Sequence, residues 1–176
     1  MDDQKSKRLP MQRKTKPKVE DVAKEILDKD KQKNVLEFVE FLKDNKLTPK
    51  WASYDSWKVT YKSKGVCFIK MNQQDEFWTI APSQLTSSEW FANCDKYITD
   101  AELKEFVLDN ISGPRCTIRD CKGRQNITIL GKKFDEVCNC WPIVFKNPTG
   151  ETLENSKKLI LVIKKFITDL VATSKI

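Results

Sequence analysis

Four of the six cysteines in this 176-residue chain are spaced like two pairs of metal ligands. Four residues separate Cys116 from Cys121, and after a further sixteen residues Cys138 and Cys140 follow with one residue between them. Four thiolates that meet in pairs can hold Zn²⁺ in a closed tetrahedral site. The single-residue gap is shorter than the usual spacing of about two to four residues. We therefore treat these cysteines as a candidate zinc site, with zinc as the candidate cofactor.

Two other interpretations of the same cysteines stay open. Arg115, Arg119 and Lys122 lie close to them in the sequence and would lower the pKa of a nearby thiol, which favours a thiol-dependent enzyme or redox protein. Alternatively the four side chains only pack, because a free cysteine behaves as a small hydrophobic residue. Cys67 and Cys94 fall in a predicted strand and a predicted helix, where packing is the expected role.

The chain contains no histidine, the commonest general base in enzymes and the side chain whose unperturbed pKa lies near neutrality. Catalysis by Ser-His-Asp or Cys-His groups is therefore excluded. The sequence has only five glycines and neither a GxxxxGK[ST] nor a GxGxxG loop for binding phosphates. We predict no catalytic residue, and a non-enzymatic protein is favoured over an enzyme.

Aromatic residues form the second candidate site, because large rings on one face of a sheet can line a ligand pocket. The candidate ligand-binding residues are Trp51, Tyr54, Trp57, Tyr61, Trp78 and Trp141. Burial in the core is the stronger alternative, because a sheet with one helix-covered face needs such side chains for packing.

The positive charge is concentrated at the N-terminus. Residues 1–18 hold seven Lys and Arg against Asp2 and Asp3, so they carry five of the seven net positive charges of the chain. Such a segment can bind nucleic acid by releasing counterions, or it can simply keep the protein soluble. The remaining residues are almost neutral, which argues against a basic groove within the domain. We expect nucleic-acid binding, if any, through residues 1–18 only.

Hydropathy indicates a folded protein outside the membrane. Hydrophobic residues make up 39% of the chain, but no apolar run approaches the roughly 20 residues that span a bilayer. The first residues are charged and lack an apolar segment of the kind found in secretory signals. We therefore expect a cytoplasmic protein without membrane contact, in which cysteines stay free or bind metal rather than form disulfides.

Composition predicts a disordered basic tail over residues 1–17, because Lys, Arg, Gln and Pro with few apolar side chains cannot support packing. Residues 18–176 are predicted to form one α+β domain. Helical spacing of apolar residues indicates two N-terminal helices and a long C-terminal helix, at 18–28, at 32–45 and after Asn147-Pro148. Capping-box patterns at Thr86–Glu89 and Thr99–Glu102 predict two more helices.

Apolar and polar residues alternate in an antiparallel meander of three predicted strands, at 57–62, 66–71 and 76–81. One or two further strands, at 127–130 and 141–145, are expected to extend this sheet. The long C-terminal helix is expected to pack on it, which completes an α+β fold.

Two segments of the chain carry a resemblance to known proteins: Trp57–Met71 (WKVTYKSKGVCFIKM) and Ile127–Lys146 (ITILGKKFDEVCNCWPIVFK), the second followed by Asn147-Pro148. They resemble small uncharacterised bacterial α+β proteins of a domain-of-unknown-function family. The resemblance covers about residues 30–170. It implies the fold and a bacterial origin, and it carries no functional residue over to this chain.

These observations favour a non-enzymatic module that binds a small molecule or a protein. The aromatic sheet face or the cysteine cluster would supply its binding surface. The alternatives are a zinc-stabilised domain, a thiol-dependent enzyme or redox protein, and nucleic-acid binding through the basic N-terminal segment.

Overall fold

The computed structural model describes residues 3–83, 88–111, 124–138 and 143–173. It confirms the α+β fold class. One sheet has five antiparallel strands in the order β1-β2-β3-β4-β7, and β5 and β6 form a separate two-stranded sheet. The strands are β1 (Pro49–Ser53), β2 (Ser56–Tyr61), β3 (Lys64–Asn72), β4 (Phe77–Pro82), β5 (Arg124–Ile129), β6 (Lys132–Cys138) and β7 (Phe145–Lys146). The helices are α1 (Asp3–Thr15), α2 (Val19–Ile26), α3 (Lys29–Asp44), α4 (Ser88–Tyr97), α5 (Ala101–Asn110) and α6 (Gly150–Thr173).

Alternation along the strands gives the five-stranded sheet one apolar face. Trp57, Ile69, Ile80 and Phe145 lie directly opposite one another across β2, β3, β4 and β7, and all four are buried. Because successive side chains of a strand point to opposite faces, the residues next to them in sequence lie on the other face.

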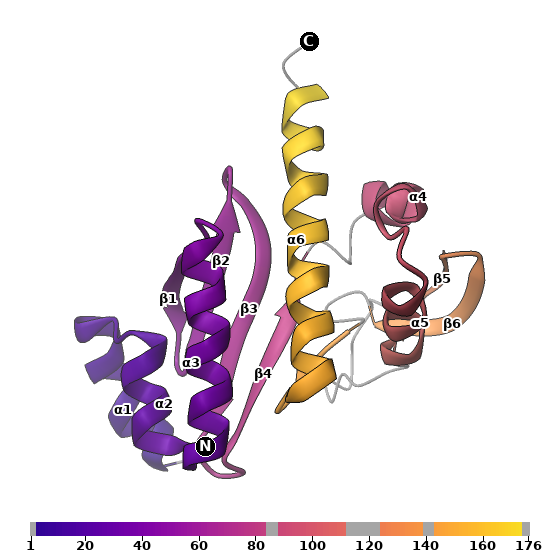
Figure 1. Cartoon of the computed structure of the whole chain (residues 1–176). Helices are drawn as coiled ribbons and strands as arrows, with labels where there is room; N and C mark the ends of the chain where they lie inside the picture. The colour runs from indigo at the N-terminus through magenta and orange to yellow at the C-terminus, as the bar shows by residue number, and fades with distance from the viewer. Residues whose placement is uncertain (1–2, 84–87, 112–123, 139–142, 174–176) are drawn as a thin grey trace.

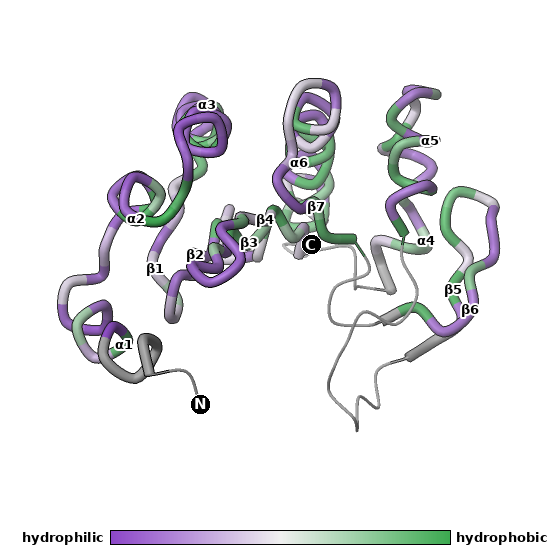
Figure 2. Tube along the Cα trace, turned by 90° about the horizontal axis from the view of Figure 1, so that it is seen from below, coloured by the Kyte–Doolittle hydropathy of each residue, from purple (hydrophilic) through white to green (hydrophobic). Residues whose placement is uncertain are grey.

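Helices α2, α3 and α6 cover the apolar face (Figure 1). Asp28 caps α3 by accepting a hydrogen bond from the backbone N–H of Lys31 at 2.8 Å. The rings of Phe38 in α3 and Trp78 in β4 then meet with their centroids 6.0 Å apart. Figure 2 shows α3, α6 and α5 in a row on this side of the sheet. Among the described residues, no helix is long and apolar enough to cross a membrane.

Helices α4 and α5 and the β5–β6 hairpin form a second layer beyond α6. Phe166 of α6 packs edge-on against both Trp90 and Tyr97 of α4, and Phe145 of β7 stacks on Phe106 of α5. The N-cap of α5 is Asp100, which accepts the Leu103 N–H at 2.7 Å, and not Thr99 as the capping-box pattern predicted. The other pattern, Thr86–Glu89, begins outside the described residues.

The structure corrects the predicted extension of the meander. The expected strand at 127–130 falls in β5, which pairs with β6 in its own sheet. Two strands do extend the meander, but they are β7, which pairs with β4, and β1, which pairs with β2 and was not predicted. Leu130 and Gly131 both have positive φ angles, 51° and 77°, as in the two-residue turns that close β-hairpins. Leucine rarely occupies such a turn, so residue types alone do not predict that the chain folds back here.

The structure also has a helix where the sequence predicted a disordered tail. In α1, the side chain of Gln12 is 1% exposed, donates to Asp55 Oδ1 at 2.6 Å and accepts from the Asp55 backbone N–H at 3.0 Å. Arg8 forms an ion pair with Glu25 at 2.8 Å and donates a hydrogen bond to Gln73. These anchors are polar, so a search for apolar periodicity does not detect them.

Replacing Gln12 with alanine tests this anchor. The Gln12→Ala variant leaves two buried polar groups of Asp55 without partners, so we expect it to lower the free energy of unfolding by about 1–3 kcal/mol. Urea denaturation measures this loss. Trypsin should also cleave faster within α1, because the helix is released from the sheet.

The matched control is Met11→Ala, at the neighbouring position of the same helix, where the side chain is 56% exposed. It should change stability by less than about 0.5 kcal/mol. If both variants behave like the native chain, Gln12 does not anchor α1.

Candidate binding surface

The structure places the predicted aromatic residues mainly in the core. Trp57 and Trp78 are 1% and 0% exposed, in agreement with the core-packing alternative. The indole N–H of Trp57 donates a hydrogen bond to the carbonyl of Pro17 at 2.8 Å. Lys164 Nζ lies over the Tyr61 ring, 5.2 Å from the ring centroid. Trp51, Tyr54 and Tyr61 are half-buried. Trp141 lies outside the described residues.

The candidate zinc site falls largely outside the described part of the chain. Cys116, Cys121 and Cys140 lie there entirely, and Cys138 is described only as the last residue of β6, where its backbone pairs with Arg124. Within the described ranges, no group of three or more Cys, Asp or Glu side chains could hold a metal ion. The zinc and reactive-thiol hypotheses therefore stay predictions.

The two described thiols are unsuited to chemistry. Cys67 and Cys94 are both buried and free. Burial raises the pKa of the Cys67 thiol far above its ordinary value and also raises that of Cys94. Since the thiolate is the nucleophile, both side chains are expected to be inert in the folded protein.

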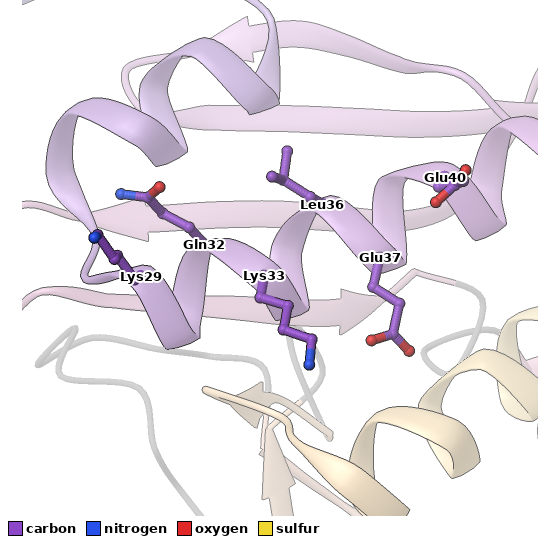
Figure 3. Close-up of a pocket in the computed structure, with 6 residues that line it drawn as sticks. All are labelled: Lys29, Gln32, Lys33, Leu36, Glu37 and Glu40. Atoms are coloured by element: carbon purple, nitrogen blue, oxygen red, sulfur yellow. The ribbon is translucent and has the colours of Figure 1, made fainter.

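A shallow concavity of about 580 Å³ lies along the outer surface of α3 (Figure 3). Its six lining residues all come from that helix: Lys29, Gln32, Lys33, Leu36, Glu37 and Glu40. Lys33 and Glu37 are four residues apart, a spacing that places opposite charges next to each other on a helix surface. This mixture of exposed charges is typical of a solvated helix, and it presents no nucleophile with a neighbouring base.

The sheet face opposite α3 and α6 has a different composition. Residues paired across neighbouring strands form two rows on this face. The first row consists of Lys50, Lys58 and Phe68, on β1, β2 and β3. The second row consists of Lys70, Thr79 and Lys146, on β3, β4 and β7. Phe77 shares this face because it precedes Thr79 by two residues. We call this surface the lysine face, defined by Lys50, Lys58, Phe68, Lys70, Phe77, Thr79 and Lys146. In Figure 2, α1 lies on the side of the sheet away from α3 and α6, next to β1.

Electrostatics make the lysine face strongly basic. The five strands contain no Asp or Glu. Lys50, Lys58 and Lys146 are exposed, and within the described residues no carboxylate lies within salt-bridge distance of them. Like charges directly opposite each other on a sheet, such as Lys50 and Lys58, are unfavourable unless an anion lies between them.

The lysine ammonium groups surround two phenylalanine rings. Lys58 Nζ and Lys70 Nζ lie 5.9 and 6.0 Å from the centroid of the Phe68 ring, and Lys146 Nζ lies 4.2 Å from that of Phe77. Both rings are half-buried. Burial also lowers the pKa of Lys70 by desolvating its ammonium group.

Acidic side chains gather elsewhere. Glu102, Glu105 and Asp109 of α5 line a second concavity, of about 330 Å³, together with Glu151 of α6. Residues 19–176 are therefore almost neutral in total because the positive charges of the sheet face are offset by the negative charges of the helix surface. Sequence reasoning missed the lysine face for this reason, although polar residues alternating with Trp57 and Val59 in β2 already indicated its position.

No protein-family model, curated protein or solved structure matches the chain. The resemblance to a domain-of-unknown-function family, and the bacterial origin that it implies, stay predictions. The lysine face is the binding surface that the residues themselves indicate.

Thiol labelling tests the environments of Cys67 and Cys94. In a variant with Cys116, Cys121, Cys138 and Cys140 replaced by serine, we expect iodoacetamide to label the folded protein at least about 100-fold more slowly than the unfolded protein, because labelling requires local opening. Mass spectrometry after timed quenching measures the two rates. Similar rates with and without denaturant would show that the two thiols are accessible. Circular dichroism of the variant checks that it is folded.

Proposed function

We propose that the chain is a non-enzymatic binding module that holds a polyanionic partner on the lysine face. The observation that carries this proposal is the set of four lysines contributed by β1, β2, β3 and β7 to a sheet face whose strands contain no acidic residue. The module is of the kind that the sequence favours, but its binding surface is the opposite face of the sheet from Trp57 and Trp78.

A polyanion suits the lysine face because the positive charges of the face are arranged in rows. The row from Lys50 to Lys58 and the row from Lys70 to Lys146 run across adjacent strands, which lie about 4.8 Å apart. A ligand with one charge would engage only one of these ammonium groups. A chain of linked anions engages several at once and releases its condensed counterions, which supplies most of the binding free energy.

Helix α1 adds to the positive charge beside the lysine face. Arg13, Lys14 and Lys16 are exposed at its C-terminal end, and among the described residues they have no carboxylate partner. The helix lies next to β1, whose Lys50 begins the first row (Figure 2). The anchor through Gln12 thus holds a second basic segment near the first, so a long polyanion can contact both.

Binding of long-chain inorganic polyphosphate tests the proposal with a ligand that has neither nucleobases nor amino-acid side chains. We expect the Lys50→Gln/Lys58→Gln/Lys146→Gln variant to bind at least about tenfold more weakly near 0.1 M salt. The slope of log K against log salt concentration should become less steep by about 2, because three anion contacts are lost. Fluorescence anisotropy of end-labelled polyphosphate measures both quantities.

The matched control replaces three exposed lysines on the helix side, in a Lys33→Gln/Lys158→Gln/Lys165→Gln variant. It has the same net charge as the first variant and should bind polyphosphate within about twofold of the native chain. Equal losses in the two variants would mean that net charge alone drives binding. No binding by the native chain even at low salt would refute the proposal.

A further inference from the structure

We infer that the polyanion is a single-stranded nucleic acid whose bases stack on Phe68 and Phe77 while its phosphates contact the surrounding lysines. This inference rests on the proposed function and adds the class of partner. The observation behind it is the alternation of half-buried aromatic rings with ammonium groups on one sheet face.

The phenylalanine rings discriminate between classes of polyanion. A ligand that offers only negative charge, such as polyphosphate, has no apolar group to place against a phenylalanine ring. Nucleobases present flat aromatic faces, and stacking of a base on an aromatic side chain contributes substantially to binding of single strands. Lysines within about 6 Å of the same ring would then neutralise the phosphates attached to that base.

The spacing of the two rings fits a short run of nucleotides. Phe68 lies opposite Ala81, which is four residues beyond Phe77 in β4, so the rings are offset by ~14 Å along the strands. A strand that advances 3.4 Å or more per nucleotide covers this offset with about four nucleotides or fewer. The row of Lys70, Thr79 and Lys146 crosses the sheet between the two ring positions. Its two lysines offer ammonium groups to the intervening phosphates, and the buried Thr79 lies between them.

A duplex does not fit this arrangement. Bases in a duplex stack on one another and are paired, so their faces cannot reach rings that are themselves half-buried in a sheet. Helices α3 and α6 lie on the other side of the sheet (Figure 2), so neither can enter a groove of a duplex that occupies the lysine face. Single strands, whose bases can be splayed out, meet these steric requirements.

The test compares labelled twelve-residue oligo(dT) and oligo(U) with polyphosphate of matched charge, using anisotropy and the full chain. We expect the native chain to bind an oligonucleotide more tightly than polyphosphate. The Phe68→Leu/Phe77→Leu variant should lose at least about tenfold in oligonucleotide affinity, because two stacking contacts are removed. Its affinity for polyphosphate should stay within about twofold of native.

Two control variants separate stacking from damage to the fold. Phe68→Tyr/Phe77→Tyr retains both rings and should keep most of the oligonucleotide affinity. Phe41→Leu changes another half-buried phenylalanine with a lysine nearby, Lys157 at 5.9 Å, but on α3 at the opposite side of the sheet, and should have no effect. Thermal unfolding of each variant checks that it is folded.

The outcomes distinguish this inference from the proposed function. If oligonucleotides bind no better than polyphosphate, if the leucine variant keeps its oligonucleotide affinity, or if a duplex binds as well as a single strand, the inference is overturned and polyanion binding stands. Tighter binding of polyglutamate than of oligonucleotide would identify an acidic protein as the partner and would also overturn it. If neither polyphosphate nor oligonucleotide binds, both proposals fail.

Discussion

Phe38 of α3 and Trp78 of β4 meet at the centre of the protein, with their ring centroids 6.0 Å apart and both side chains fully buried. This contact joins the helix layer to the sheet. Burial of large rings is the main favourable term in the folding of a domain of this size. Once Trp78 faces α3, the strict alternation of a strand fixes the direction of every other side chain in β4, and the pairing register extends that choice to β3, β2, β1 and β7.

The composition of the lysine face is a consequence of the same constraint. Lys58 points away from the helices because Trp57 and Val59 point toward them, and Thr79 does so because it lies between Trp78 and Ile80. A shift of register by one residue would bury Lys58 and Lys70 and expose the tryptophans. The same strand register therefore determines both which side chains form the core and which form the candidate binding surface.

Helix α1 shows how polar contacts can add an element that the core does not require. Its fixed points are the hydrogen bonds of Gln12 to Asp55 and the ion pair of Arg8 with Glu25. Pro17, which follows the helix, accepts a hydrogen bond from the buried Trp57, so the chain is tied to the core where α1 ends. The basic N-terminal segment consequently lies beside the sheet rather than extending freely from it.

Elements with local signals could be predicted from the order of amino acids alone. Periods of 3.6 and 2 residues were enough to predict α2, α3 and α6 and the strands β2, β3 and β4, because each pattern lies within one continuous segment. The three-dimensional fold establishes which strands pair. Strand β5 pairs with β6, and β7 pairs with β4, where Phe145 lies opposite Ile80, 65 residues earlier in the chain. The fold also decides that Lys50 and Lys146, far apart in sequence, lie on one face with Phe68 and Phe77. Local spacing cannot specify such a surface, because the choice of partner strand depends on burial shared among distant segments.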